Sequence, residues 1–211
     1  MSKKNAQKSR VKLSSQGYDL YAKFYDKTLQ FLNSFEKGKL VEFCGDLNGK
    51  KVLDIGCGTG REIGLLKAAN PNPKTSFTAA DISDEMLKIT KRRHPDVETI
   101  KADMNSTPFK DEEFDVVIAA FVIVHVKNLH KAFKEIDRIL KPGGIFILTN
   151  INQRKAPKLQ TENEKIVIKS FYHIPEHVIE ALKESFFEIE KEEFVEENGT
   201  WINQIVRARK I

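Results

Sequence analysis

The sequence has few cysteines and no long hydrophobic segment, and each shortage excludes a class of protein. Cys44 and Cys57 are the only cysteines among 211 residues, too few for a disulfide framework and without the spacing of a zinc site. No apolar run approaches the ~20 residues that a membrane-spanning helix needs. The N-terminus is basic but is not followed by the apolar segment of a secretory signal. We therefore expect a cytoplasmic protein and, from the length, a single domain.

Acidic residues are missing from the first twelve positions, which hold Lys3, Lys4, Lys8, Arg10 and Lys12. The rest of the chain has 30 basic and 30 acidic residues, so the net charge of +5 resides in this segment. The domain itself therefore lacks the basic excess that is common in nucleic-acid-binding proteins. We expect residues 1–15 to form a flexible, solvated tail. The alternative is an electrostatic tether to RNA or to anionic lipid.

Strand-like and helix-like segments alternate after a helical region at residues 16–46. Buried strands are expected at 51–55, 75–80, 97–101, 115–120 (with an apolar extension to 124) and 145–150. Ser83 and Asn128 are expected to cap two of the intervening helices. This alternation predicts βαβ units, a parallel sheet and helices on both of its faces.

The last sixty residues have a different pattern. Residues 151–170 are polar and are expected to be irregular, and a helix is expected after Pro175. Two strand-like segments, 187–196 and 200–208, are joined by Asn198-Gly199. This dipeptide is a strong hairpin signal, so an antiparallel hairpin should close the chain.

The segment VLDIGCGTG at residues 52–60 is the most informative, because a predicted strand leads through three glycines into a helix. Gly56, Gly58 and Gly60 allow a ligand to lie against the main chain, and we expect free N–H groups at the helix start to face it. Their G-x-G-x-G spacing differs from the G-x-G-x-x-G that fits a pyrophosphate. Asp54 would repel a phosphate and suits a ligand that carries positive charge. A glycine-rich turn without a ligand is the alternative.

The acidic residue followed by G-x-G-x-G resembles the first motif of the class I S-adenosylmethionine-dependent methyltransferases. Residues 102–109, ADMNSTPF, and the segment 114–144, which ends in LKPGG, also resemble that family. Within it, the chain is most similar to the small-molecule branch that includes the quinone C-methyltransferases. The resemblance covers about residues 18–150.

The resemblance implies an α/β, Rossmann-like fold with a mostly parallel seven-stranded sheet and helices on both faces. The expected strand order is 3-2-1-4-5-7-6, with strand 7 antiparallel. We expect one domain over residues 1–211, made of four parts. These are the tail at 1–15, a helical cap at 16–46, a cofactor-binding core at 47–150, and a substrate-side segment with the hairpin at 151–211.

The resemblance also implies S-adenosylmethionine as cofactor. Asp81, after the second strand, would accept hydrogen bonds from the ribose diol, or would only be an acid favoured at a helix start. Asp103 would reach the adenine amino group, and Ile82 and Met104 would be walls for the ring or plain core residues. The expected cofactor-binding residues are Asp54, Gly56, Cys57, Gly58, Gly60, Asp81, Ile82, Asp103, Met104, Ala120, Tyr18 and Tyr25, the two tyrosines lying near the methionine end.

Two histidines are candidates for a general base, which helps when the methyl acceptor must lose a proton. His125 lies just past the fourth strand, and His173 lies in the C-terminal segment; either could instead be structural. The sequence after the fourth strand, Ala119-Ala120-Phe121-Val122, lacks the N/D-P-P-Y/F of methyltransferases that act on adenine amines.

The resulting hypothesis is methyl transfer to a small-molecule acceptor, with no metal. One alternative is an RNA methyltransferase that uses the basic tail. Another is a partner subunit that binds the cofactor without catalysis.

Overall fold

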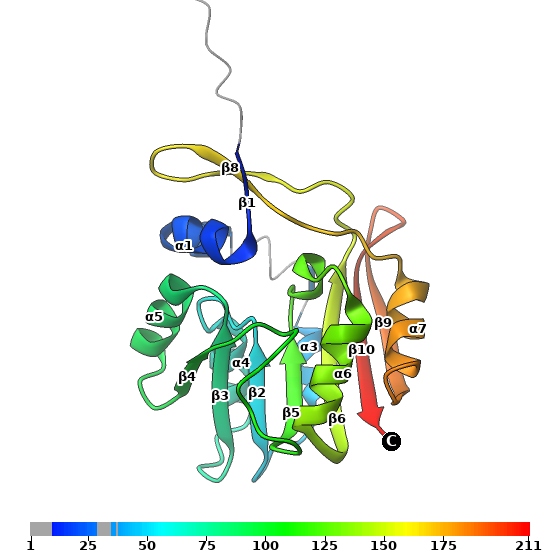
Figure 1. Ribbon diagram of the computed structural model, residues 1–211. Helices are drawn as coiled ribbons and strands as arrows, with labels where there is room; N and C mark the ends of the chain where they lie inside the picture. Colours follow the sequence, from blue (N-terminus) through cyan, green and yellow to red (C-terminus); the bar gives the residue numbers. More distant parts are fainter. Residues whose placement is uncertain (1–9, 29–34, 37) are drawn as a thin grey trace, which may run out of the picture.

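The computed structural model describes residues 10–28, 35–36 and 38–211. These residues form a seven-stranded sheet of order β4-β3-β2-β5-β6-β10-β9 (Figure 1). Neighbouring strands are parallel from β4 to β6, and β10 is antiparallel to both β6 and β9. The predicted order, with an antiparallel seventh strand, is therefore confirmed. The strands are β2 (Lys51–Ile55), β3 (Ser76–Asp81), β4 (Glu98–Lys101), β5 (Phe114–Ala119), β6 (Leu140–Ile151), β9 (Phe187–Glu197) and β10 (Thr200–Lys210).

Helices cover both faces of the sheet (Figure 1). One buried cluster joins α3 (Lys39–Cys44) and α4 (Arg61–Ala69) to the sheet, and a larger one joins α6 (Leu129–Ile139) and α7 (Pro175–Lys183) to its other face. Helix α5 (Asp84–Arg93) packs beside β3 and β4. Both predicted caps are present: Ser83 Oγ accepts from Met86 N–H at 3.2 Å, and Asn128 Oδ1 accepts from Lys131 N–H at 3.1 Å.

A second, three-stranded sheet lies above the carboxyl ends of the parallel strands, together with α1 (Ser14–Tyr25) (Figure 1). Its order is β1 (Arg10–Lys12), β8 (Lys165–Ile168) and β7 (Lys158–Gln160). A short 3-10 helix, η1 (Asp26–Thr28), follows α1. Helix α1 packs tightly on the sheet, because a Cβ on Gly17 would lie 2.6 Å from Ile168 Cγ1.

This small sheet corrects two expectations. The tail was expected to be flexible to residue 15, but residues 10–12 pair in parallel with β8, and Ser14 begins α1. Residues 1–9 lie outside the described part of the chain. Residues 151–170 were expected to be irregular, but they contain β7 and β8, and along β8 the buried Ile166 and Ile168 alternate with the less buried Lys165 and Val167. That alternation is the signal of a strand with one covered face.

The main sheet also differs from the prediction at two strand ends. Strand β5 stops at Ala119 instead of continuing to residue 124, and Phe121 takes a left-handed backbone with φ of 61°. A 3-10 turn, η2 (Ile123–His125), follows. Strand β6 begins at Leu140, so the expected LKPGG turn is part of the strand. The turn of the chain at Phe121 directs the residues after β5 over the carboxyl edge of the sheet.

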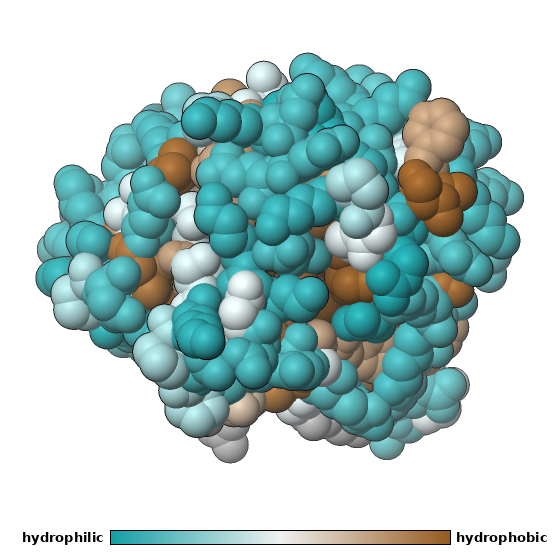
Figure 2. Space-filling view, turned by 90° about the horizontal axis from the view of Figure 1, so that it is seen from below, coloured by the Kyte–Doolittle hydropathy of each residue, from teal (hydrophilic) through white to brown (hydrophobic). Residues whose placement is uncertain are grey.

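The end of the molecule opposite the small sheet is mostly hydrophilic, with scattered hydrophobic patches (Figure 2). Among the described helices, none has the length and apolar character needed to cross a bilayer. The cavities that matter for function lie at the other end, between the sheet edge and α1.

Candidate active site

A cavity of about 290 Å³ lies at the carboxyl ends of β2, β3 and β5, beside α1. In an open α/β sheet this edge is where ligands bind. The cavity brings together most of the residues predicted from the sequence: Tyr18, Tyr25, Gly56, Gly58, Asp81, Ile82, Asp103, Met104, Ala120 and His125. The sequence did not single out Ser14, Ser15, Asn105 or Val122, which line it as well. Ser14 and Ser15 belong to the segment that was expected to be a free tail.

Four N–H groups of the glycine turn, ahead of the helix start, already have hydrogen-bond partners. Those of Gly56 and Cys57 donate to the carbonyl oxygen of Ala80 at 2.7 and 3.0 Å, and that of Gly60 donates to Cys57. Gly58 N–H donates to Asp81 Oδ2 at 2.9 Å. A phosphate site depends on such donors pointing at the anion. Because these four are already used, the turn is unsuited to a pyrophosphate.

The charged groups of the cavity lead to the same conclusion. Asp81 and Asp103 line it, and none of the other described lining residues is a lysine or arginine. Asp81 is 6% exposed, and its oxygens accept from Gly58 N–H and, at 2.8 Å, from Ser83 N–H. Burial raises the pKa of Asp81, while these backbone hydrogen bonds act to lower it. An acidic cavity without cations favours a ligand that carries positive charge and hydroxyl groups over one that carries phosphate.

Gly58 is a glycine of the turn that borders open space. Its φ is +55°, and a Cβ there would have only Tyr25 Cε1 nearby, at 3.8 Å. The missing side chain therefore leaves room in the cavity itself. Gly56 serves packing instead, because a Cβ on it would lie 2.2 Å from Val122 Cγ2.

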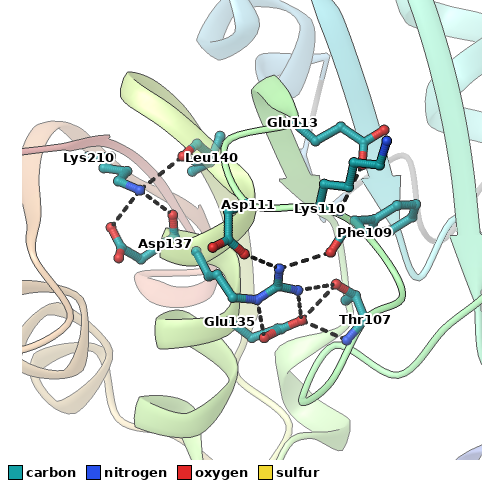
Figure 3. Close-up of polar contacts among 10 residues, drawn as sticks. Thr107, Phe109, Lys110, Asp111, Glu113, Glu135, Asp137, Leu140 and Lys210 are labelled. Atoms are coloured by element: carbon teal, nitrogen blue, oxygen red, sulfur yellow. Dashed lines mark hydrogen bonds and ion pairs between the residues drawn. The ribbon is translucent and has the colours of Figure 1, made fainter.

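The loop that carries Asp103 is fixed from behind by α6. Arg138 donates to both carboxylate oxygens of Glu135, to Asp111 and to the carbonyl of Phe109 (Figure 3). Glu135 Oε1 also accepts from the N–H and the hydroxyl of Thr107, each at 2.7 Å. Although burial opposes ionisation, these contacts with Arg138 and Thr107 lower the pKa of Glu135 to about 2. The clamp holds the chain that directly follows Asp103.

Four predicted residues, Asp54, Cys57, Gly60 and His173, do not line the cavity. Cys57 is buried, with its Sγ 3.8 Å from Thr90 Oγ1. Gly60 has a φ of +79° and allows α5 to approach, because a Cβ would lie 2.8 Å from His94 Cδ2. His173 Nε2 is within 3.1 Å of the carbonyl oxygens of Ile123 and Val126. His173 thus ties the C-terminal segment to η2 and is placed as a structural residue.

Asp54 lies behind the glycine turn, 1% exposed, with no described hydrogen-bond partner for its Oδ2. Nearby, Arg61 forms ion pairs with Glu36 and Glu62, which are also buried. Burial raises the pKa of Asp54 to about 7, although Arg61 opposes the shift. This carboxyl group is therefore sensitive to any positive charge brought close to it.

Tyr18 and His125 form a hydrogen-bonded pair at one wall of the cavity. His125 Nδ1 lies 2.9 Å from the carbonyl oxygen of Lys169, which can only accept, so Nδ1 carries the proton. Burial lowers the pKa of His125, which favours the neutral ring. Its Nε2 is then an acceptor, and the Tyr18 hydroxyl donates to it at 2.7 Å.

A second cavity of about 550 Å³ adjoins the first. The two share the side chains of Tyr18, Tyr25, Phe121 and His125 as walls. The remaining lining is mostly apolar: Tyr21, Phe35, Val124, Ile151, Pro157, Leu159 and Ile168, with Asn152, Gln153, Arg154 and Lys155 in sequence along one part. Residues 151–168 of this lining belong to the segment expected on the substrate side. The cavity itself was not predicted, because its other walls come from α1 and from the region after β5.

Comparison with known proteins identifies the family. A family model described as "Methyltransferase domain" matches residues 53–148. An uncharacterized protein of Methanocaldococcus jannaschii is 31% identical over 199 residues, which cover 82% of this chain and 75% of that protein. A demethylmenaquinone methyltransferase of Staphylococcus aureus is 34% identical over 145 residues, which cover 64% of this chain and 59% of that enzyme.

Solved structures share the fold. The crystal structure of an S-adenosylmethionine-dependent methyltransferase from Mesorhizobium loti superposes with a TM-score of 0.69 at 17% identity, covering 83% of this chain and 97% of that one. The chain belongs to the class I S-adenosylmethionine-dependent methyltransferases, and its cofactor is S-adenosylmethionine.

The residues of the first cavity fit this cofactor. The cavity offers two carboxylates to a ligand with an ammonium group, a sulfonium and a ribose diol, and the part of its lining that the structure describes includes no lysine or arginine that would repel that ligand. Gly58 leaves space that a Cβ would fill. Ile82, Met86 and Met104 supply apolar walls of the kind that an adenine ring requires.

Proposed function

We propose that the protein methylates a small, largely apolar molecule that binds in the second cavity. The observation that carries this proposal is the shared wall of the two cavities, formed by Tyr18, Tyr25, Phe121 and His125. An acceptor in the second cavity would meet the cofactor cavity at these side chains. The similarity to a quinone methyltransferase is consistent with an apolar acceptor.

Bound S-adenosylmethionine supplies a methyl group on a sulfonium, so the protein mainly has to hold a nucleophile in line, at about 3–3.5 Å. In the proposal, Asp81 and Asp103 hold the ribose and the adenine, and Tyr25 and the glycine turn surround the methionine end. The lining of the second cavity excludes water and orients the acceptor.

We assign the removal of an acceptor proton to the Tyr18–His125 pair. The Tyr18 hydroxyl would take the proton from the acceptor while passing its own to His125 Nε2, which becomes an imidazolium held by the Lys169 carbonyl. Burial raises the pKa of Tyr18, so the residue starts as a neutral phenol. Tyr18→Phe should lower kcat by about 10²-fold for an acceptor that loses a proton. In the wild type, kcat should rise with pH as His125 loses its proton and can accept another, and this rise should be absent in Tyr18→Phe.

The proposal is tested by filling the second cavity alone. Leu159 lines it from β7, whereas its exposed neighbour Lys158 does not. Leu159→Trp should abolish transfer of labelled methyl from S-adenosylmethionine to small molecules of a cell extract, and Lys158→Trp should not. Both variants should bind S-adenosylhomocysteine as the wild type does. Unchanged methyl transfer in a folded Leu159→Trp protein would contradict the proposal.

The RNA alternative has no support from the described part of the basic segment. Arg10 and Lys12 both lie within 4 Å of Glu164 carboxylate oxygens, at 3.9 and 3.4 Å. These two cations belong to the small sheet and are partly neutralised there.

A further inference from the structure

Apart from His125 and the hydroxyl groups of three tyrosines, the described polar lining of the second cavity is one run of four residues at 152–155. Among the described residues that line it, Arg154 and Lys155 are the only ionisable ones apart from His125 and the tyrosines, and none is a carboxylate. The cavity therefore combines an apolar interior with positive charge in one place. This distribution differs from the first cavity, which is acidic.

The guanidinium of Arg154 is held in position by an aromatic ring. Its Cζ lies 5.4 Å from the centroid of the Tyr172 ring, a cation–π contact. Neither Arg154 nor Lys155 donates a hydrogen bond or forms an ion pair with any residue that the structure describes. An arginine that is positioned by stacking and keeps its N–H groups free is suited to receive a carboxylate, sulfonate or phosphate.

From this juxtaposition we infer that the methyl acceptor is an amphipathic anion, an apolar ring system that carries one acidic group, and that Arg154, assisted by Lys155, binds the acidic group. The inference rests on the proposed function in that it gives the second cavity to the acceptor. The acidic group sets the orientation of the acceptor, and the apolar part reaches toward Tyr18 and Phe121 at the shared wall.

Two fluorescent dyes of equal ring structure test the inference without any turnover. 1-Anilinonaphthalene-8-sulfonate carries a sulfonate, and N-phenyl-1-naphthylamine has the same rings without it. The wild type should bind the sulfonate dye more tightly. Arg154→Gln should weaken its binding about tenfold, the size expected for a lost contact between charged groups, and should change the neutral dye less than about twofold. Added salt should weaken only the sulfonate dye.

Control variants locate the binding site. Lys158→Gln removes an equal, nearby charge that does not line the cavity and should leave both dyes unaffected. Leu159→Trp should weaken both. Arg154 is exposed, so its substitution should not unfold the protein, and the dye comparison holds even if Leu159→Trp misfolds. Equal effects of Arg154→Gln on the two dyes, or none on either, would overturn the inference.

Two further measurements distinguish a failure of the anion site from a failure of the proposed function. Binding of S-adenosylhomocysteine, measured by calorimetry, and methyl transfer in the extract assay report on the function alone. A protein that discriminates the dyes through Arg154 but transfers no methyl group would keep the anion site and lose the acceptor assignment. A protein that transfers methyl groups but does not discriminate the dyes would keep the function and lose the anion site.

Discussion

Removal of the Asp81 carboxylate should weaken cofactor binding specifically through the ribose. Asp81 accepts Gly58 N–H on one oxygen and Ser83 N–H on the other. Each carboxylate oxygen has a further acceptor position, so both can also receive a ribose hydroxyl. Asp81→Ala loses the ribose bonds and the two backbone bonds together. A fall in affinity alone would therefore not distinguish a ligand contact from damage to the turn.

A comparison with 2′-deoxy-S-adenosylhomocysteine separates the two effects. A hydrogen bond to a charged group is worth roughly 1.5–3 kcal/mol, so the wild type should prefer the parent ligand by at least about tenfold. In Asp81→Ala this preference should fall to about one, because the partner of the hydroxyl is gone. Damage to the turn weakens both ligands equally and cancels in the cycle.

Asp84 provides the matched control. It lies three residues further on, in the first turn of α5, where it pairs with Lys101 and does not line the cavity. Asp84→Ala should keep the wild-type preference for the 2′-hydroxyl. Calorimetric titration of both ligands into the three proteins gives all the values. An Asp81→Ala protein that retains the preference would refute the ribose assignment.

Three further changes have definite expected results. Gly58→Ala and Gly49→Ala should each lower the free energy of unfolding by about 1–2 kcal/mol, since both glycines have left-handed backbones. Only Gly58→Ala should also weaken the binding of S-adenosylhomocysteine, by at least about tenfold. Equal binding of this ligand by both variants would contradict the prediction. Burial raises the pKa of Asp54 from 3.8 to about 7. Between these pH values the folded protein keeps a proton on Asp54 that the unfolded chain loses. The free energy of unfolding of the wild type should therefore fall by roughly 4 kcal/mol as the pH rises from 4 to 7. Urea unfolding of Asp54→Asn should lack that fall. The pKa of Glu135 is about 2 in the folded protein and near 4.5 in the unfolded chain, so the ionised carboxylate stabilises the fold fully above pH 4.5. The difference in free energy of unfolding between the wild type and Glu135→Gln should therefore become smaller as the pH drops toward 2.

The sheet and the cofactor side of the site could be predicted because their signals are local. Asp81 ends an apolar strand, and the glycine turn follows another, so the rule that places ligands at the carboxyl edge brings both to one cavity. The chemistry of a single short motif was enough to exclude a phosphate ligand. The structure then supplies a second reason, the occupied N–H groups of the turn.

The roles of individual motif residues depended on contacts far away in the sequence. Position 60 must be a glycine because the His94 ring, just after α5, packs where a Cβ would lie. The Nε2 of His173 lies within hydrogen-bond distance of the carbonyl oxygens of Ile123 and Val126. Neither contact can be read from spacing. The pairing of residues 10–12 with β8 likewise joins segments more than 150 residues apart. The apolar residues 166–168 are typical of a strand, but nothing in them identifies residues 10–12 as the partner.

The most direct test of the account is a crystal structure of the protein with S-adenosylhomocysteine. We expect the ligand in the first cavity, with its ribose hydroxyls on Asp81, its adenine against Ile82 and Met104, and its sulfur facing the wall shared with the second cavity. Electron density for the ligand elsewhere, or a first cavity that stays empty at saturating ligand while the fold is intact, would contradict the account.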